Sequence, residues 1–533
     1  MIRPRHLLPA VLLLALAVRV WGIGFGIPFV NARPDETQIA GPAVGFLTGD
    51  LRPPLLEWPT LFPYTVALLY LLYYALTRPL TGYGTLEAFA ESRRVDISPF
   101  IYITRAASIV MGVVTVWGVY AIAKRTFDST VALVAALFLA LSFLHVRDSH
   151  FGVTDVPMTA LVILAVLAIV SWRQTGGLRR AAIAGVVAGL ATSTKYNGLG
   201  VVVPFAVAVA QRFVEERPGA GSIARAVAAL VVFGGALAVT LFSTSPYILI
   251  DWARFVRSVT ATQSMVIQGH GMVLGRGWWY YARVVLPAAL GWPIFLAGTI
   301  GIGVLLVRRF RESAVVLAFP IAYYVVAGRG YGVFARYIIP VIPFLCISAA
   351  WLTVETARWL ARASSERTGR VVVVAATLAM LLPTAYKTVV LDRLLSTTDN
   401  RTIAGRALVD VLPTDSLFYQ SGEGYGHAPL AVEGRRAAVR MASFNVETGR
   451  FVPEDPDWIL VQRSPLVIYS SVPPSLERVL QERYVIARRL PTESRPVSDR
   501  IYDQQDAFYL PLAKLEGLER PGPAFDLYKR RSD

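Results

Sequence analysis

Two acidic side chains stand out because they follow the first long apolar run of the chain. Asp35 and Glu36 come about ten residues after that run ends. A carboxylate at the edge of a membrane span usually faces water or a cavity, because facing lipid is costly. There it could take the proton from an acceptor hydroxyl or amine. The alternative is structural, since acids after Pro34 could cap a helix and lie at the positive end of its dipole.

A second polar cluster lies between two later apolar runs and concentrates residue types that are rare in the apolar part of the chain. Its members are His145, Arg147, Asp148, His150 and Asp155. Imidazole and carboxylate groups suit acid–base chemistry or the binding of a polar substrate. The alternatives are a polar hairpin exposed to solvent and, for Asp155, a cap on the helix that follows.

Two cationic residues stand at further boundaries of apolar runs. Lys195 follows a Thr-Ser-Thr sequence and is the only lysine between residues 125 and 386, while Arg336 precedes Tyr337 at the start of another run. Lysine binds phosphate as a point charge and arginine binds it through two parallel hydrogen bonds. A snorkelling lysine and an interfacial anchor are the alternatives.

Aromatic residues crowd one stretch between apolar runs. His270 is followed by Trp278-Trp279 and then by Tyr280 and Tyr281. Rings at this density suit either the membrane surface or a surface on which a sugar stacks. The sequence leaves both possibilities open.

The composition predicts a membrane protein. Of 533 residues, 55% are hydrophobic and 17% are charged, with a mean hydropathy of +0.51; soluble proteins carry about 25% charged residues. The net charge is +16, but most arginines form short clusters between apolar runs, which suits cytoplasmic loops and not nucleic acid. The single cysteine, Cys346, allows no internal disulfide and no thiol metal site.

Twelve apolar runs approach the roughly 20 residues that a membrane span needs. They lie at 7–25, 58–77, 100–123, 130–144, 156–172, 179–193, 198–212, 224–245, 284–307, 314–328, 335–354 and 370–388. If all twelve crossed, the later basic clusters would face outward, against the positive-inside rule. If 58–77 does not cross, the prediction places these basic clusters on the cytoplasmic side, the same side as Arg3 and Arg5. We therefore predict eleven spans, a cytoplasmic N-terminus and an outer C-terminus.

The run 58–77 has its own reason not to cross, because it begins with two prolines and carries five aromatic residues. Aromatic residues favour the membrane interface, so we expect a juxtamembrane or re-entrant helix inside a long outer loop, 26–99. Residues 145–155 would form another outer loop. We expect residues 1–389 to be the transmembrane domain and 390–533 to be an outer soluble domain of α/β type, in which short apolar runs alternate with polar residues.

On this topology, the carboxylates, imidazoles, cations and aromatic residues all share the outer face. A transferase that uses a lipid-phosphate sugar needs such groups: a carboxylate accepts the acceptor's proton and cations neutralise the leaving phosphate. Two other classes stay open. A transporter or flippase of lipid-linked saccharides would normally show internal repeats, which we do not find, and a polysaccharide polymerase or ligase would also have large outer loops.

The ordered set of motifs resembles the protein O-mannosyltransferases and the bacterial lipid A aminoarabinose transferases. The motifs are Arg33-Pro34-Asp35-Glu36-Thr37, Thr154-Asp155-Val156-Pro157, Ser193-Thr194-Lys195, Trp279-Tyr280-Tyr281 and Arg336-Tyr337 with Pro340 and Pro343. The resemblance covers roughly residues 5–350 and is closest to uncharacterised bacterial members.

The resemblance implies a GT-C fold in a bacterial inner membrane, a polyprenyl-phosphate sugar donor and inversion at the sugar carbon. Asp35 is then the general base or positions the acceptor, Asp155 is a second active-site acid, and Lys195 and Arg336 with Tyr337 bind the donor phosphate. A divalent ion, Mg²⁺ or Mn²⁺, held by Asp35 and Asp155 stays an open possibility. The acceptor is a glycolipid, a cell-envelope glycan or a protein.

Two departures from the aminoarabinose transferases concern their donor and acceptor. The first is Gln38, at a position where those enzymes carry an arginine. The second is the sequence Glu57-Trp58-Pro59, where those enzymes have Glu-Lys-Pro. Glu57 stays a candidate substrate contact, but the sugar and the acceptor are not expected to be those of the aminoarabinose enzymes.

Overall fold

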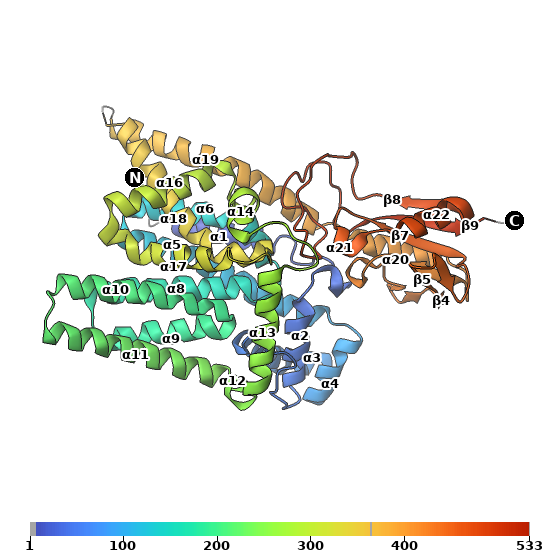
Figure 1. Cartoon of the computed structure of the whole chain (residues 1–533), viewed down its shortest axis with the longest axis horizontal. Coiled ribbons are helices and arrows are strands. Elements are labelled where there is room, and N and C mark those ends of the chain that lie inside the picture. Colours follow the sequence, from blue (N-terminus) through green and yellow to red (C-terminus); the bar gives the residue numbers. More distant parts are fainter. Residues whose placement is uncertain (1–6, 363–364, 532–533) are drawn as a thin grey trace. The chain divides into compact units, whose positions relative to one another are not determined.

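The computed structural model describes residues 7–362 and 365–531, which divide into two compact units (Figure 1). The first unit comprises Met1–Val20 and Gln38–Val389, and the second comprises Trp21–Thr37 and Val390–Asp533. The short segment after the first helix therefore folds with the C-terminal part of the chain. Arg3 and Arg5, which entered the topology prediction, lie outside the described residues.

The chain is a mostly helical, multi-span membrane protein, as the sequence predicts. Over the described ranges, seven helical segments are long and apolar enough to cross a membrane, and a bent pair would make an eighth. The seven are α5 (Ser98–Thr126), α8 (Asp155–Thr175), η4 with α10 (Tyr196–Glu215), α11 (Ala220–Thr244), α17 (Phe310–Ala327), η6 with α18 (Ala335–Leu360) and the segment that begins with α19, Glu366–Leu395. The finer number, eleven, stays a prediction.

Three further predicted runs form helices below that length. They are α1 (Leu8–Val20), α9 (Leu178–Thr194) and α16 (Trp292–Arg308). The run 58–77 forms α3 (Leu61–Thr81), which has 21 residues but is not among the seven. Its place at the membrane interface stays a prediction.

The bent pair corrects one expectation about the second polar cluster. Helices α6 (Ser129–Ala140) and α7 (Phe143–Ser149) meet at an angle of 59°, so residues 143–149 are helical where the sequence suggested a loop. All residues from 145 to 155 are buried, which excludes the exposed polar hairpin. The physical reason is that Phe143, Leu144 and Val146 fill the interior while the polar side chains find partners there.

Helix α9, which Lys195 directly follows, makes a close contact with α11. Gly185 and Gly189 lie one turn apart on α9, and a methyl group on them would come within 2.3 and 2.7 Å of the carbonyl oxygens of Phe233 and Leu237 on α11. Small residues at this spacing let two membrane helices approach backbone to backbone. The two helices lie side by side in Figure 1.

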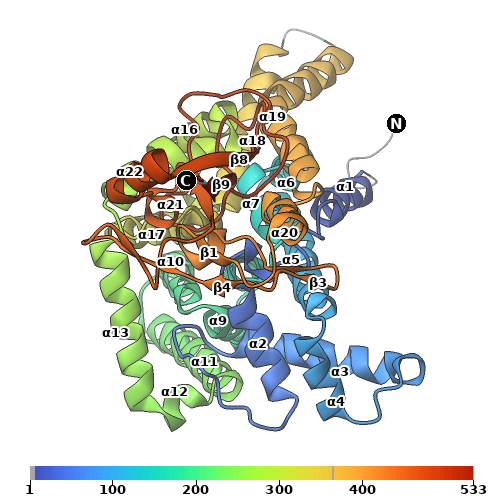
Figure 2. The same cartoon turned by 90° about the vertical axis from the view of Figure 1, so that its right-hand side faces the viewer.

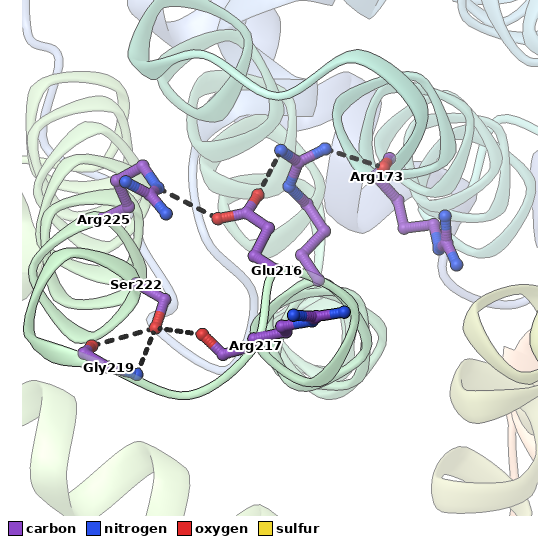
Figure 3. A network of polar contacts seen from close by, with 7 residues as sticks. Arg173, Glu216, Arg217, Gly219, Ser222 and Arg225 are labelled. Carbon is purple, nitrogen blue, oxygen red and sulfur yellow. Dashed lines mark hydrogen bonds and ion pairs between the residues drawn. The ribbon is translucent and has the colours of Figure 1, made fainter.

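Four consecutive helices, α8 to α11, carry their basic residues at one shared end. Figure 3 shows that end, where Glu216 accepts hydrogen bonds from Arg212 (2.6 Å) and Arg225 (2.9 Å). Arg212 also donates to the backbone oxygen of Arg173 (3.1 Å). The hydrogen bond from Arg225 is the largest influence that lowers the pKa of Glu216. Asp155 begins α8 at the opposite end, about 30 Å away by the rise of the helix.

The outer segments predicted from the sequence contain short helices. After the first apolar run come α2 (Glu36–Phe46), α3 and α4 (Leu86–Glu91), with η2 (Val30–Ala32) and η3 (Ser92–Arg94) beside them. Between α11 and α16 come α12 (Tyr247–Ile250), α13 (Trp252–Gln268), α14 (Gly277–Tyr280), the π-helical turn η5 (Tyr281–Val285) and α15 (Leu286–Leu290).

The second unit contains a mixed five-stranded sheet with the order β4-β1-β7-β9-β8 (Figure 2). Strands β1 (Leu417–Gln420), β4 (Arg440–Met441) and β7 (Trp458–Arg463) are parallel, and β9 (Ala524–Arg530) is antiparallel to β7 and β8 (Tyr484–Leu490). Two small ladders pair β2 (Ala431–Val432) with β3 (Arg435–Arg436) and β5 (Ser443–Asn445) with β6 (Arg450–Val452).

Helices cover both faces of this sheet, which explains why β7 is almost wholly apolar. Leu460 packs in a cluster with α20 (Asn400–Val411), and its neighbours Ile459 and Val461 pack in a cluster with α22 (Pro474–Arg483). A strand covered on both sides is apolar throughout. Helix α21 (Val467–Ser470) and the turn η7 (Gly424–Gly426) complete the unit, whose α/β character agrees with the sequence.

The α9–α11 contact predicts a selective effect of side-chain size. We expect Gly185→Val to lower the melting temperature of the purified protein in detergent, because overpacking a close contact costs roughly 1–3 kcal/mol. Gly303→Val on α16 is the matched control, since no atom lies within 4 Å of its added methyl position. Equal melting temperatures for the two variants would contradict the contact.

Candidate functional site

Two of the predicted site residues form a buried ion pair. Asp155 is the first residue of α8, and Lys195 directly follows α9. The Nζ atom of Lys195 lies 2.6 Å from Oδ1 of Asp155, and the two side chains are only 12% and 4% exposed. Charges removed from water are normally paired, and these two residues meet that requirement for each other.

Aromatic and cationic side chains from a distant segment adjoin this pair. The ammonium of Lys195 lies 4.8 Å from the ring centre of Tyr337. The buried guanidinium of Arg336 lies 4.7 Å from the ring centre of Phe334 and 5.8 Å from that of Tyr337. The ring of His270 lies 5.4 Å from Phe334. Five residues predicted from four separate motifs therefore belong to one connected group in the first unit.

Local backbone structure explains how Arg336 and Tyr337 are presented. They open the 3-10 helix η6 (Ala335–Val341), which contains Pro340 and precedes Pro343. Prolines lack the N–H that a regular α-helical turn needs. The hydroxyl of Tyr323 on α17 donates to the backbone oxygen of Tyr337 (2.9 Å) and holds this turn.

The same Tyr323 hydroxyl lies 3.5 Å from Nδ2 of Asn197, two residues after Lys195. Tyr323 is buried inside an apolar helix, and it links the two segments that carry the candidate phosphate-binding residues. Sequence reasoning missed it. The available signal was a tyrosine within an apolar run, where a hydroxyl needs a partner.

The second polar cluster is organised by an arginine that sequence reasoning also missed. Arg19, near the end of α1, is fully buried and donates to the backbone oxygen of Ala140 (3.0 Å), to Ser149 Oγ (3.2 Å) and toward Nδ1 of His145 (3.0 Å). It therefore satisfies a carbonyl where α6 ends, as cations at helix C-termini do. Gly112 leaves room for it, because a methyl group there would lie 2.9 Å from Nε of Arg19.

This contact fixes the protonation of His145. Arginine has only donors, so Nδ1 of His145 accepts, and the neutral ring carries its proton on Nε2. That Nε2 atom is buried and reaches no hydrogen-bond partner within residues 7–362 and 365–531.

The remaining members of the cluster are equally buried. Arg147 and its neighbour Asp148 form an ion pair of 2.8 Å with side chains 1% and 0% exposed. Nδ1 of His150 lies 2.9 Å from the backbone oxygen of Val146, one helical turn earlier. Charged side chains such as Arg147 and Asp148 are rarely fully buried unless they are paired.

The acidic pair lies in the second compact unit. Asp35 immediately precedes α2, and the fully buried Glu36 is the first residue of that helix. The helix start predicted as the structural alternative is therefore present. Asp35, however, has a φ angle of +72°, whereas a capping residue normally has extended backbone. Capping alone does not explain a left-handed aspartate.

The other predicted contacts are placed as follows. Glu57 is exposed ahead of α3, Tyr280 is half-buried, and Tyr281 is fully buried where the π-helical turn begins. Tyr281 is buried in this structure, while Tyr280 and Glu57 keep exposed atoms.

The two residues expected to hold a divalent cation, Asp35 and Asp155, lie in different compact units. Over the described ranges, no group of three or more His, Cys, Asp or Glu side chains could hold a metal ion. One of the two candidate ligands, Asp155, already has the ammonium of Lys195 at its carboxylate. No step proposed below uses a metal.

Comparison with known proteins gives one family match. Residues 102–250 match the family model described as dolichyl-phosphate-mannose-protein mannosyltransferase. That stretch contains Asp155, Lys195 and the cluster from His145 to His150. The predicted family resemblance is confirmed.

Curated relatives point to the other family named by the motifs. The undecaprenyl phosphate-alpha-4-amino-4-deoxy-L-arabinose arabinosyl transferases of Pseudomonas paraeruginosa and Pseudomonas aeruginosa are both 26% identical to this chain, over 295 and 294 residues. The alignments cover 52% of this chain and 48% of each relative. The chain thus spans about half the length of the curated relatives it matches. All these matches are to glycosyltransferases, the class of enzyme that the sequence predicts.

Solved structures give only a coarse similarity. The Archaeoglobus fulgidus oligosaccharyltransferase has a TM-score of 0.48 at 13% identity, covering 88% of this chain and 72% of its own. ArnT from Cupriavidus metallidurans bound to undecaprenyl phosphate has a TM-score of 0.46 at 14% identity, covering 90% and 96%. These scores add nothing to the family match.

The buried Asp155–Lys195 pair predicts a non-additive effect on stability. Asp155→Asn or Lys195→Gln should each destabilise the protein by about 3–5 kcal/mol, because each leaves one buried charge without its partner. The double variant should be more stable than either single variant. Unfolding in detergent measures all three.

The exposed pair of Arg309 and Glu312 supplies the control, since its atoms are 3.8 Å apart and the side chains are 56% and 47% exposed. Its variants should change stability by less than about 1 kcal/mol. Additive losses from Asp155→Asn and Lys195→Gln would mean that the pair is not coupled.

Proposed function

We propose that the chain is an inverting glycosyltransferase that moves a sugar from a polyprenyl-phosphate donor to an acceptor outside the bacterial inner membrane. The acceptor is a glycolipid, a cell-envelope glycan or a protein. The observation that carries the proposal is the buried pair of Asp155 and Lys195 beside Arg336 and Tyr337. Lys195 and Asp155 also lie in the stretch that matches the mannosyltransferase family.

The proposed reaction is a single displacement at the anomeric carbon. An acceptor oxygen or nitrogen attacks that carbon while its bond to the phosphate oxygen breaks, which inverts the configuration. Asp35 takes the proton from the acceptor. The polyprenyl phosphate leaves with the bonding electrons, and Lys195 and Arg336 stabilise its charge.

Asp155 acts through Lys195 in this proposal. Its carboxylate already pairs with the ammonium at 2.6 Å, so it orients a cation and is less suited to receive a proton. Tyr337 lies against the same ammonium and restricts its position. From the sequence, Asp155 is expected to be a second active-site acid. Here we propose that it positions Lys195 instead.

The remaining candidate residues are proposed to contact the substrates. For His145, the proposed contact is a donation from the buried Nε2, which has no partner within the described ranges, to a substrate oxygen. His270 adjoins Phe334 and the group around Arg336. Arg147, Asp148, His150, Tyr280, Tyr281 and Glu57 stay candidates from the sequence, and Glu36 is proposed to support Asp35.

The proposed topology has eleven spans, a cytoplasmic N-terminus, a membrane domain at 1–389 and an outer C-terminal domain at 390–533, with which residues 21–37 fold. The arrangement of α8 to α11 supports it. Their arginine-rich ends meet around Glu216, while Asp155 and Lys195 lie at the opposite ends. The positive-inside rule assigns the arginine-rich ends to the cytoplasm, and the candidate phosphate-binding residues then face outward.

The proposed base predicts that Asp35→Asn abolishes transfer while the protein still folds. Asparagine tolerates left-handed backbone, so the φ of +72° need not change, but the amide cannot accept the proton. We expect a loss of about 10²- to 10⁴-fold, the usual contribution of a general base. Mass spectrometry of lipid-linked sugars and envelope glycans measures it in a deletion strain that expresses each variant.

Asp50→Asn is the matched control because Asp50 is an exposed aspartate of the same predicted outer loop. It should restore the missing glycan as the unaltered protein does. Full restoration by Asp35→Asn would refute the proposed base. Movement of a lipid-linked sugar across the membrane without any new glycosidic bond would instead indicate a transporter, and transfer of several sugars in one block would indicate a ligase.

A further inference from the structure

The segment that carries Asp35 folds with the C-terminal part of the chain. Residues Trp21–Thr37 and Val390–Asp533 form one compact unit. Before α2 begins at Glu36, the segment forms the short 3-10 helix η2 (Val30–Ala32) and a series of turns. At Gly26, where φ is +72°, an added methyl group would lie 2.3 Å from Cβ of Ala32. This close internal contact makes the segment compact, and the segment then packs against the C-terminal part of the chain.

A buried ion pair joins this segment to the C-terminal part. Nη1 of Arg33 donates to both carboxylate oxygens of Asp506, at 3.0 and 3.1 Å. The side chains of Arg33 and Asp506 are only 1% and 2% exposed. The Arg33 guanidinium also lies 5.4 Å from the ring centre of Phe508, and the edge of Phe25 meets that ring at 5.6 Å.

A second buried arginine also contacts this segment, but it belongs to the C-terminal part of the chain. Arg401 of α20 makes a two-fold hydrogen-bonded pair with Asp399, at 2.8 and 2.7 Å. Its guanidinium lies between aromatic rings, 5.2 Å from the centre of Phe29 and 5.3 Å from that of Tyr509. Burial raises the pKa of Tyr509, so this ring stays neutral beside the cation.

The anchored Arg33 lies two residues before Asp35 in the sequence. Arg33 is anchored by Asp506, Pro34 has a fixed φ, and Asp35 then adopts its left-handed conformation with φ of +72°. A non-glycine residue keeps such a conformation only where its surroundings determine it. Through Pro34, the anchored Arg33 restricts the backbone that leads into Asp35.

We propose that the Arg33–Asp506 pair is a positioning device through which the C-terminal domain holds Asp35 in its reactive conformation. The inference rests on the proposed function. It makes Arg33 and Asp506 positioning residues, since neither needs to touch the substrate. The C-terminal domain is then part of the catalytic apparatus and not only an appended module.

The test compares Asp506→Asn with Asp410→Asn in the full-length protein. Asp410 also pairs with an arginine of the same unit, Arg435, at 2.7 Å, but both side chains are more than half exposed. Misplacing a reacting group by about 1 Å costs roughly 10²-fold in rate. We expect Asp506→Asn to lower kcat by about 10- to 100-fold with KM for the donor unchanged, and Asp410→Asn to leave both unchanged.

A second variant and a second measurement separate positioning from general unfolding. Arg33→Lys keeps the positive charge and should retain more activity than Arg33→Gln, because a lysine can still pair with Asp506. Hydrogen exchange of residues 21–37 should be faster in Asp506→Asn while exchange in the strands of the central sheet is unchanged. This readout does not depend on catalysis.

The outcomes distinguish the two proposals. If Asp506→Asn exchanges faster in 21–37 but keeps its kcat, or if it alters only KM, the positioning proposal is overturned and the proposed function stands. If Asp506→Asn exchanges like the unaltered protein throughout, the anchoring itself is wrong. If the unaltered protein transfers no sugar, the proposed function fails, and the positioning proposal fails with it.

Discussion

The ammonium of Lys195 lies in a mostly buried position, with the carboxylate of Asp155 2.6 Å away. An ammonium removed from water without a partner would lose its proton or destabilise the fold, so the pair requires the first residue of α8 to meet the residue after α9. The close approach of α9 to α11 at Gly185 and Gly189 helps to fix where α9 ends. The aromatic rings that follow from η6 are arranged around the same cation.

Three buried arginines show a similar need for partners in the interior. Arg19 is held by the carbonyl group that ends α6, Arg33 by Asp506, and Arg401 by Asp399. Each joins segments that are distant in the sequence, or lies between rings from such segments. A buried charge tolerates few alternative arrangements, since every other arrangement leaves it unpaired. In this chain, the buried arginines therefore specify geometry near each group of predicted site residues.

The sequence predicts the local features well, because they depend on patterns within a short stretch. Each of the twelve apolar runs coincides with helical structure, and the C-terminal part has the expected α/β character. Asp155, Lys195, Arg336, Tyr337 and His270 were identified by residue type and motif, and the structure connects them. The break between α6 and α7 was missed, because its backbone groups bond to Arg19, Thr384 and Thr388, all more than a hundred residues away.

The folding of residues 21–37 with the C-terminal part could not be predicted for the same reason. Nothing near Arg33 in the sequence indicates that its partner is Asp506, and the sequence assigned the segment to the long outer loop of the membrane domain. The positive φ of Asp35 is likewise not fixed by its residue type, since aspartate adopts that conformation more readily than most residues but still in a minority of positions. Long-range partners and backbone strain are properties of the folded chain.

The most direct test of the account is an experimental structure of the protein with polyprenyl phosphate bound. The account predicts that the phosphate oxygens lie within hydrogen-bonding distance, about 2.7–3.2 Å, of Nζ of Lys195 and of the guanidinium of Arg336, with Asp155 still paired to Lys195. A phosphate bound elsewhere, with Lys195 and Arg336 contacting only protein groups, would contradict it.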